Sequence, residues 1–374
     1  MHKDNTHNKS EPELTGDPWD TFCDTLRQAG KAMRDANASD DELAIAEGYR
    51  YLMRMIRVGF ELTHEYGDPQ FPTLTTMIDS VTSYEGAGSD ARYLHAFIDG
   101  TQTYRISGTR GTAPLIEIGV YTGKVGFNDT ASVTRSITEE DLIVDDDGSI
   151  DIVLSPNQHD GNWLATDQYS RYLMIRQYSH DWSRTTRGML TIEREGGGKR
   201  GAPGLAQIND DMHRTAEFVS RQARFWGGLS RHGLNSSINQ FVAFGSEDDD
   251  ADLSLPTGHR FASTYFRLAP DEVLICRFLP CDVPFWSFEL ANYWYEVIGY
   301  GREETHLNNK TVVYAADGSV TVAIAHRSNG FDNELLTLGH REGTAMFRWS
   351  RSLSPIPDIE TRLVKTSDLE HGYE

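Results

Sequence analysis

Cysteine is scarce in this sequence, with only three residues and no CxxC pair among them. Three is an odd number and too few for a disulfide framework, so we interpret Cys23, Cys276 and Cys281 as ordinary reduced thiols. Long apolar runs are also missing, because no stretch reaches the roughly 20 residues that cross a bilayer. The polar stretch Met1 to Leu14 lacks the apolar core of a secretory signal. We therefore expect a cytoplasmic protein without a membrane partner.

Positive charge is in short supply as well. The sequence has 35 Lys and Arg against 56 Asp and Glu, which leaves a formal net charge of −21. Phosphate neutralisation needs clustered Lys and Arg, so this balance argues against nucleic acid or anionic lipid as partners. The densest acidic run, Glu247 to Asp252, lacks the glycine and the distal glutamate of a calcium loop, and we interpret it as a solvated loop.

Motifs for metals and cofactors are missing too. The sequence contains no HExxH, no Cys/His cluster, no GxSxG elbow and no Rossmann fingerprint. The glycine-rich stretch Gly196 to Gly201 lacks the Gly-Lys-Ser/Thr ending of a phosphate loop. We predict no metal and no cofactor, although the 13 scattered histidines can still converge in space.

What the chain does contain is a change of pattern along its length. At 374 residues it exceeds the size at which one core stops growing, which predicts two domains. Helical spacing follows a cap at Asp17-Pro18 and a capping box at Ser39 to Glu42, whereas period-two alternation begins near Tyr93. We expect a disordered tail over 1–14, a helical segment over 15–85, a first β-domain over 86–195, a linker and connecting helix over 196–245, and a second β-domain over 246–374.

The second predicted helix carries one apolar stripe at three- and four-residue steps. Its members are Ile45, Tyr49, Leu52, Met53, Ile56 and Phe60. Such a stripe is typical of a helix face that packs on a core, so we expect these side chains to be buried.

The two β regions resemble each other in three successive segments. Asp147 to Ile152 is answered by Asp317 to Val322, Asn162 to Leu164 by Asn333 to Leu335, and Leu173 to Tyr178 by Ala345 to Trp349. Asp-Gly turns are common in β proteins, so chance is the alternative, but the shared order favours duplication. We predict a mainly β protein with flanking α-helices, in which two tandem related antiparallel β-sandwich or jelly-roll-like domains leave a ligand cleft at their junction.

Several motifs of the C-terminal part stand in a known order. They are Phe285 to Phe288, Asn292 to Tyr295, Leu307-Asn308, Asp317-Gly318, Leu338 to Gly343 and Phe347 to Trp349. In this order they resemble the bacterial family called domain of unknown function 1214. The first β region, with Tyr104 to Gly111, Gly161 to Leu164 and Ile175 to Gln177, looks like the upstream part of the longer members, so the resemblance spans most of residues 40–370. It implies a two-part β architecture and a setting near genes for steroid, terpenoid or aromatic catabolism, without an established general reaction.

Four arginines lie within or beside the predicted strands, namely Arg105, Arg110, Arg176 and Arg348. A guanidinium group is expensive to bury unless it meets a carboxylate, a carbonyl or a ligand. The structural interpretation pairs these arginines with acids such as Asp151, Asp181 or Glu289. The functional interpretation is a clamp for an anionic substrate, which bidentate arginine suits.

Aromatic residues are dense between Phe285 and Tyr295. If this segment is one strand, Trp286, Asn292 and Trp294 share a face and Tyr295 lies on the other. Such aromatics are usually core, but the polar Asn292 on an apolar face needs a partner or would line a wet cavity. We therefore assign Trp286, Asn292, Tyr295 and Asn308 to substrate binding, with the alternative that Asn308 caps a loop.

Two sites combine an imidazole with a nearby carboxylate. His340 stands in the Gly339 to Gly343 turn, and His180 precedes Asp181. An imidazole near a carboxylate can act as a general acid or base, so His340 and Asp181 are our catalytic candidates. Neighbours on a strand point apart, however, and exposed turn residues are the alternative.

The leading hypothesis from these patterns is a catabolic enzyme without a cofactor. It would use acid–base chemistry of the hydrolase, hydratase or lyase type on an apolar small molecule with a polar or anionic group. The alternatives are a β-sandwich protein that binds a small molecule or a partner without catalysis, and an oligomeric scaffold. A homo-oligomer is compatible with each of these hypotheses.

Overall fold

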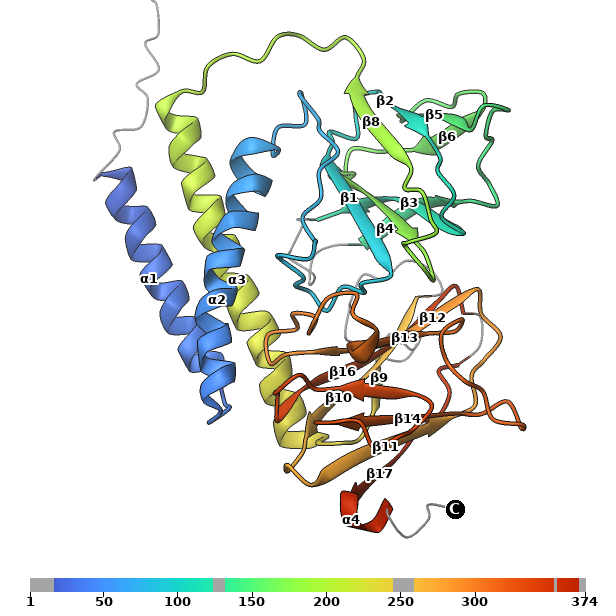
Figure 1. The fold of residues 1–374 in the computed structure, drawn as a ribbon. Coiled ribbons are helices and arrows are strands. Elements are labelled where there is room, and N and C mark those ends of the chain that lie inside the picture. Colours follow the sequence, from blue (N-terminus) through green and yellow to red (C-terminus); the bar gives the residue numbers. More distant parts are fainter. Residues whose placement is uncertain (1–16, 124–131, 245–258, 353–354, 370–374) are drawn as a thin grey trace, which may run out of the picture.

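The computed structural model describes residues 17–123, 132–244, 259–352 and 355–369 (Figure 1). The tail expected over 1–14 and the acidic loop at 247–252 lie outside these ranges. Three long helices lie together on one side of the molecule, and two β-sandwiches are stacked on the other. The third helix runs past both sandwiches.

The first helix begins where the sequence predicts. α1 spans Pro18–Ala36, and the Asp17 carboxylate accepts the Trp19 N–H at 2.8 Å, which satisfies one free donor of the first turn. α2 spans Glu42–Phe60 and continues as a π-helical turn over Glu61–Glu65. α3 spans Leu205–Ser236 and follows the predicted linker. No helix in these ranges is both long enough and apolar enough to cross a membrane.

The apolar stripe of α2 is not the main buried face, so the prediction was wrong for four of its six members. Ile45, Tyr49, Met53 and Phe60 are exposed, whereas Leu52 and Ile56 are partly buried against the core. The buried face instead carries Gly48, where an added Cβ would lie 2.7 Å from Met33 Sδ and 2.8 Å from a ring carbon of Trp294. The buried face also carries Tyr51, Met55 and Val58, so small residues on it allow close approach while these larger side chains fill the space beside them.

The first sandwich contains eight strands. They are β1 Ala91–Phe97, β2 Tyr104–Thr109, β3 Leu115–Thr122, β4 Ser132–Thr138, β5 Ser149–Ser155, β6 Asn162–Ala165, β7 Tyr172–Tyr178 and β8 Met189–Arg194. One sheet has the order β1-β7-β3-β4 and the other the order β6-β5-β2-β8. Their facing sides form a core of aliphatic residues such as Ile106, Ile118 and Ile175.

The second sandwich repeats this topology and adds one edge strand, β9, beside β10. Its strands are β9 Val242–Phe244, β10 Arg260–Arg267, β11 Glu272–Phe278, β12 Phe285–Ala291, β13 His306–Asn308, β14 Val320–Ala325, β15 Glu334–Leu336, β16 Glu342–Ser350 and β17 Glu360–Lys365. A 3₁₀ turn over Glu303–Thr305 precedes β13, and α4 (Thr366–Leu369) ends the described chain. The sheet orders are β13-β12-β16-β10-β9 and β15-β14-β11-β17, so β10 corresponds to β1, β12 to β3 and β16 to β7. The predicted pair of related β-sandwiches is confirmed.

Each sandwich also contains one parallel pair, which the antiparallel prediction did not include. β6 pairs with β5 and β15 pairs with β14 in parallel. One asparagine holds each connection in the same way. The Asn162 side chain bonds the N–H and C=O of Ile143 at 2.8 Å each, and Asn333 bonds the N–H and C=O of Val313 at 2.7 and 2.9 Å. The two asparagines that match in the sequence repeat therefore also make matching hydrogen bonds.

The strand expected to run from Phe285 to Tyr295 is shorter in the structure. β12 ends at Ala291, because the Asn292 side chain accepts the backbone N–H groups of Trp294 at 2.9 Å and Glu296 at 3.0 Å. This side chain offers the backbone an alternative to the sheet and turns the chain. Trp294 consequently packs on Tyr51 of α2 instead of continuing the strand face.

Candidate functional site

Charged side chains are buried where the two sandwiches meet. Ile118 of β3 and Phe288 of β12 point into the sandwich cores, so their neighbours Glu117 and Glu289 point out of them. We call this junction the seam. Its members are Glu85, Ser89, Asp90, Tyr93, Glu117, Arg176, His259, Glu289, His306, Asn308 and Arg348.

The first part of the seam centres on Glu117. Arg176 of β7 lies directly opposite on the sheet, with its Nη1 3.6 Å from Glu117 Oε1. His259, from the second sandwich, places Nε2 2.7 Å from Glu117 Oε2. Burial would raise the pKa of Glu117, but His259 and Arg176 outweigh this effect and hold the pKa below its ordinary value. Glu117 thus forms ion pairs with both side chains.

The second part centres on Glu289. Arg348 of β16 lies diagonally across the sheet, with Nη1 3.5 Å from Glu289 Oε2. Ser89 donates its backbone N–H to Glu289 Oε2 at 3.0 Å and its hydroxyl to Oε1. Burial raises the pKa of Glu289, although His306, Arg348 and Ser89 act in the opposite direction. At Glu289 the effect of burial on the pKa is the larger one, whereas at Glu117 the effect of the neighbouring charges is larger.

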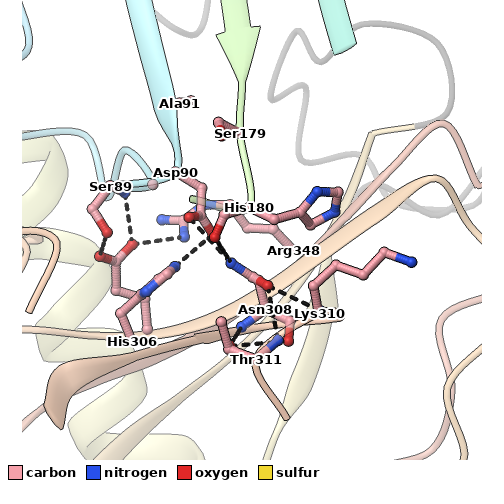
Figure 2. Close-up of polar contacts among 12 residues, drawn as sticks. Ser89, Asp90, Ala91, Ser179, His180, His306, Asn308, Lys310, Thr311 and Arg348 are labelled. Carbon is pink, nitrogen blue, oxygen red and sulfur yellow. Dashed lines mark hydrogen bonds and ion pairs between the residues drawn. The ribbon is translucent and has the colours of Figure 1, made fainter. Parts of the chain in front are cut away.

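An aspartate of the first sandwich reaches the second sandwich beside this pair. Figure 2 shows Asp90 pointing toward His306 and Asn308. The Nε2 atom of His306 lies 2.5 Å from Asp90 Oδ2, and Asn308 Nδ2 donates to Oδ1 at 3.3 Å. Burial lowers the pKa of His306, but Asp90 outweighs it and the pKa is raised. The Asn308 amide also donates to the His180 carbonyl at 3.1 Å, so this corner joins three segments.

Glu85 stands out in the loop that leads into β1. Its backbone adopts φ 60°, followed by φ 56° at Gly86, and a left-handed conformation is uncommon for a residue with a Cβ. Burial raises the pKa of Glu85 to about 7, against the opposing effects of Arg176 and Gln222. Strain and a shifted pKa together are typical of functional positions.

Several polar atoms of this region are buried without a hydrogen-bond partner. They include Glu85 Oε1, Glu117 Oε1, His180 Nε2 and Arg348 Nη1. In the same region Glu85, Tyr93 and Arg176 keep part of their surface accessible. Buried polar groups are normally satisfied by protein or water, so these atoms mark places that water or a ligand would fill.

The structure brings three of the predicted site residues into the seam: Arg176, Arg348 and Asn308. Two others meet in a separate network on α2. There His340 Nε2 lies 3.1 Å from Glu47 Oε1, and Arg50 joins Glu47 to Glu296, which accepts the Asn292 amide at 3.0 Å. Burial lowers the pKa of His340, but Glu47 outweighs it and raises the pKa above the ordinary value.

The remaining predicted site residues lie elsewhere. Arg105 pairs with Asp151 on an exposed strand face, and Arg110 donates to the Ala113 carbonyl at 2.6 Å. Asp181 caps its own turn through Ser183 and pairs with Arg184 at 3.5 Å. Trp286 belongs to the second core, and Tyr295, with φ 57°, packs on Trp226. The expected carboxylate partners are thus present for Arg105 and Arg348.

Sequence reasoning missed most of the seam, namely Glu85, Ser89, Asp90, Glu117, His259 and His306. One local signal was available. The stretch Glu85 to Asp90 places two carboxylates among glycines and small residues, a composition that suits a strained loop threaded between domains. The histidines carried no such signal, because their partners are remote in sequence.

A surface hollow of about 900 Å³ lies away from the seam, at the end of the second sandwich. It is lined mainly by apolar atoms, with Leu268, Pro270, His326 and Arg341 among its residues. Both ring nitrogens of His326 are engaged, by Thr337 and by the Leu268 carbonyl. The hollow is large, but its wall is mainly apolar and its histidine is already engaged. We therefore favour the seam as the candidate site. Within the described ranges, no group of three or more His, Cys, Asp or Glu is arranged to hold a metal ion.

Comparisons with known proteins support the family resemblance. The model of the family described as "Protein of unknown function (DUF1214)" matches residues 89–181, which is the first sandwich rather than the C-terminal part where we expected the match. No curated protein matches the chain. An uncharacterized protein from Burkholderia cenocepacia has a crystal structure with 29% identity and a TM-score of 0.88, over 94% of this chain and 97% of the other. The VPA0106 protein from Vibrio parahaemolyticus is 13% identical, with a TM-score of 0.45 over 90% and 100%.

Proposed function

We propose that this chain, whose residues 89–181 match the family of proteins of unknown function DUF1214, is an enzyme that acts by acid–base chemistry at the seam. The substrate is an apolar small molecule with a polar group, and the reaction is of the hydrolase, hydratase or lyase type. The three free cysteines fit a reducing compartment, which supports a cytoplasmic enzyme.

The observation that carries this proposal is Glu85. A general acid or base works best when its pKa lies near the operating pH, and burial raises the pKa of Glu85 to about 7. Its Oε1 atom is buried and unpartnered, so one oxygen is available to exchange a proton with a bound molecule. The left-handed backbone at Glu85 is a second argument for a functional role, because strained conformations of this kind are often kept at functional sites.

The charges of the seam favour an uncharged polar group over an anion. Arg176 and Arg348 already contact Glu117 and Glu289, and a second anion would compete with these carboxylates. Glu85 and Asp90 add further negative charge in the ionised form. A hydroxyl or carbonyl group avoids this repulsion and still offers hydrogen bonds to the unpartnered atoms.

The test is turnover of a panel of terpenoid, steroid and aromatic esters, alkenes, alcohols and ketones, followed by mass spectrometry. Glu85→Gln keeps the shape but cannot exchange the proton, so we expect a loss of about 100-fold or more in rate. Glu193→Gln, at an exposed position of β8, is the matched control and should retain the rate. A panel member that binds at the seam without any product would instead favour the non-catalytic binding protein.

A further inference from the structure

Each glutamate of the two Glu–Arg pairs in the seam also accepts a hydrogen bond from a residue of the other sandwich. Ser89, two residues before β1, bonds Glu289 on β12 of the other sandwich. His259, directly before β10, bonds Glu117 on β3 of the first sandwich. These contacts join corresponding strands but not corresponding positions, because Glu117 lies opposite Arg176, whereas Ser287 lies opposite Arg348 and Glu289 is two residues further along. The seam therefore consists of two half-sites of similar composition: the first is Glu117, Arg176 and His259, and the second is Glu289, Arg348 and Ser89.

The half-sites differ in how their arginines are satisfied. Arg176 donates from Nη1 to the Tyr121 hydroxyl at 2.5 Å and also pairs with Glu117. Arg348 is only 9% exposed, yet its Nη1 has no hydrogen-bond partner and its Nη2 contacts the Met346 sulfur at 3.6 Å. A buried guanidinium with an unused donor loses hydrogen bonds that water would supply. The second half-site is thus open to an acceptor.

There is also room for an acceptor beside Arg348. A Cβ built on Gly88 would lie 3.4 Å from Arg348 Nη1 and 3.8 Å from Glu289 Oε2, so the glycine leaves about the space of one methyl group, or one oxygen atom, next to the free donor. The ring of Phe261 lies on the guanidinium, 6.0 Å from its central carbon, and Tyr93 borders the loop through a 3.2 Å bond from Gly88 N–H. An unused donor and a methyl-sized space thus lie side by side, near the Phe261 ring and the Tyr93 hydroxyl.

We propose that Arg348 is the anchor for the carbonyl oxygen of an apolar ketone, aldehyde or ester bound beside Gly88. This inference identifies the polar group of the ligand that binds at the seam. It rests on the proposed function only in taking the seam as the binding site. A neutral carbonyl fits better than a carboxylate, because Glu289 lies 3.5 Å from the same nitrogen and would repel an anion. Phe261 and Tyr93 supply aromatic surface for the apolar part of the molecule.

The experiment uses the full chain with acetophenone and cyclohexanone as probes and benzoate as their anionic counterpart. Ligand-observed NMR measures the dissociation constants, and crystals soaked with the tightest probe locate it. Gly88→Ala fills the proposed space with a methyl group at ordinary contact distances, so the fold should tolerate it. Gly198→Ala is the matched control, because nothing lies within 4 Å of its new Cβ. Arg348→Lys is the second variant, since it keeps the charge but loses the donor geometry.

We expect the ketones to bind the wild type and Gly198→Ala equally, and to bind Gly88→Ala and Arg348→Lys at least about tenfold more weakly. Ketone binding that survives both substitutions, or a preference for benzoate, would overturn the inference, as would the failure of both ketones to bind. Loss of ketone binding in Arg176→Lys with no effect at Arg348 would move the ligand to the first half-site and also reject it. If the ketones bind at Arg348 while Glu85→Gln leaves turnover unchanged, the anchor stands and the acid–base function fails.

Discussion

The Nε2 atom of His306 lies 2.5 Å from Oδ2 of Asp90, and this contact joins the second sandwich to the first (Figure 2). The ordinary pKa of histidine is 6.5; burial lowers the pKa of His306, but Asp90 raises it by more than burial lowers it. A histidine with a raised pKa stabilises the fold at pH values below the ordinary pKa. This contribution is lost as the pH rises through the pKa of the folded state.

The first prediction concerns this contact. His306→Gln should lower the free energy of unfolding by roughly 2 kcal/mol at about pH 5.5, where the imidazolium is paired with Asp90. The deficit should shrink toward pH 9, because the wild-type histidine is then neutral. Urea unfolding at both pH values measures it. A deficit that grows with pH would contradict the assigned pairing.

The second prediction concerns the asparagines of the repeat. Asn333 is 3% exposed and makes three bonds, to both backbone groups of Val313 and to the Thr321 carbonyl. Asn333→Ala should cost about 3 kcal/mol, because the backbone groups stay buried without partners. Asn162→Ala should cost less, since water can reach that partly exposed site. Denaturant unfolding, with Asn157→Ala as an exposed control, tests whether the order holds.

The third prediction follows from the raised pKa of Glu85. Its folded value of about 7 exceeds the ordinary 4.5, so Glu85 stabilises the fold when protonated and the contribution falls as the pH rises from 4.5 through 7. Glu85→Gln should therefore match the wild type at about pH 4.5 and exceed it by roughly 3 kcal/mol at about pH 8. Thermal unfolding of both proteins across this pH range measures how their stabilities diverge. Equal stability at both pH values would mean that the carboxyl titrates normally.

The fourth prediction compares two arginine pairs. Arg176→Met leaves the carboxylate of Glu117 buried beside His259 alone and should cost about 3 kcal/mol. Arg105→Met breaks a pair whose side chains are 48% and 51% exposed and should cost less than about 1 kcal/mol. Chemical denaturation of the two variants in parallel tests the contrast, and similar costs would refute the burial argument.

Local signals in the sequence predicted much of the fold. The cap at Asp17 placed the start of α1, and the paired Asp-Gly-Ser turns revealed the duplicated sandwiches, because turns and alternation depend on neighbouring residues. The α2 stripe was misjudged because hydrophobicity does not say which face can approach a neighbour closely. Gly48 decides this through its contact with Trp294, and that tryptophan comes from the other end of the chain.

The candidate site was less predictable because its chemistry arises from remote partners. His306 meets Asp90 across 216 positions, and His259 meets Glu117 across 142. No spacing rule links such residues. Arg176 and Arg348 were accessible to prediction, because a guanidinium on a buried strand must have a partner wherever the chain supplies one.

The reciprocal contacts of Ser89 and His259 make the two sandwiches depend on each other. Either sandwich alone would leave its outward glutamate without the hydrogen bond that the other supplies here. Because a buried carboxylate without partners is costly, separating the two sandwiches would disturb both half-sites together.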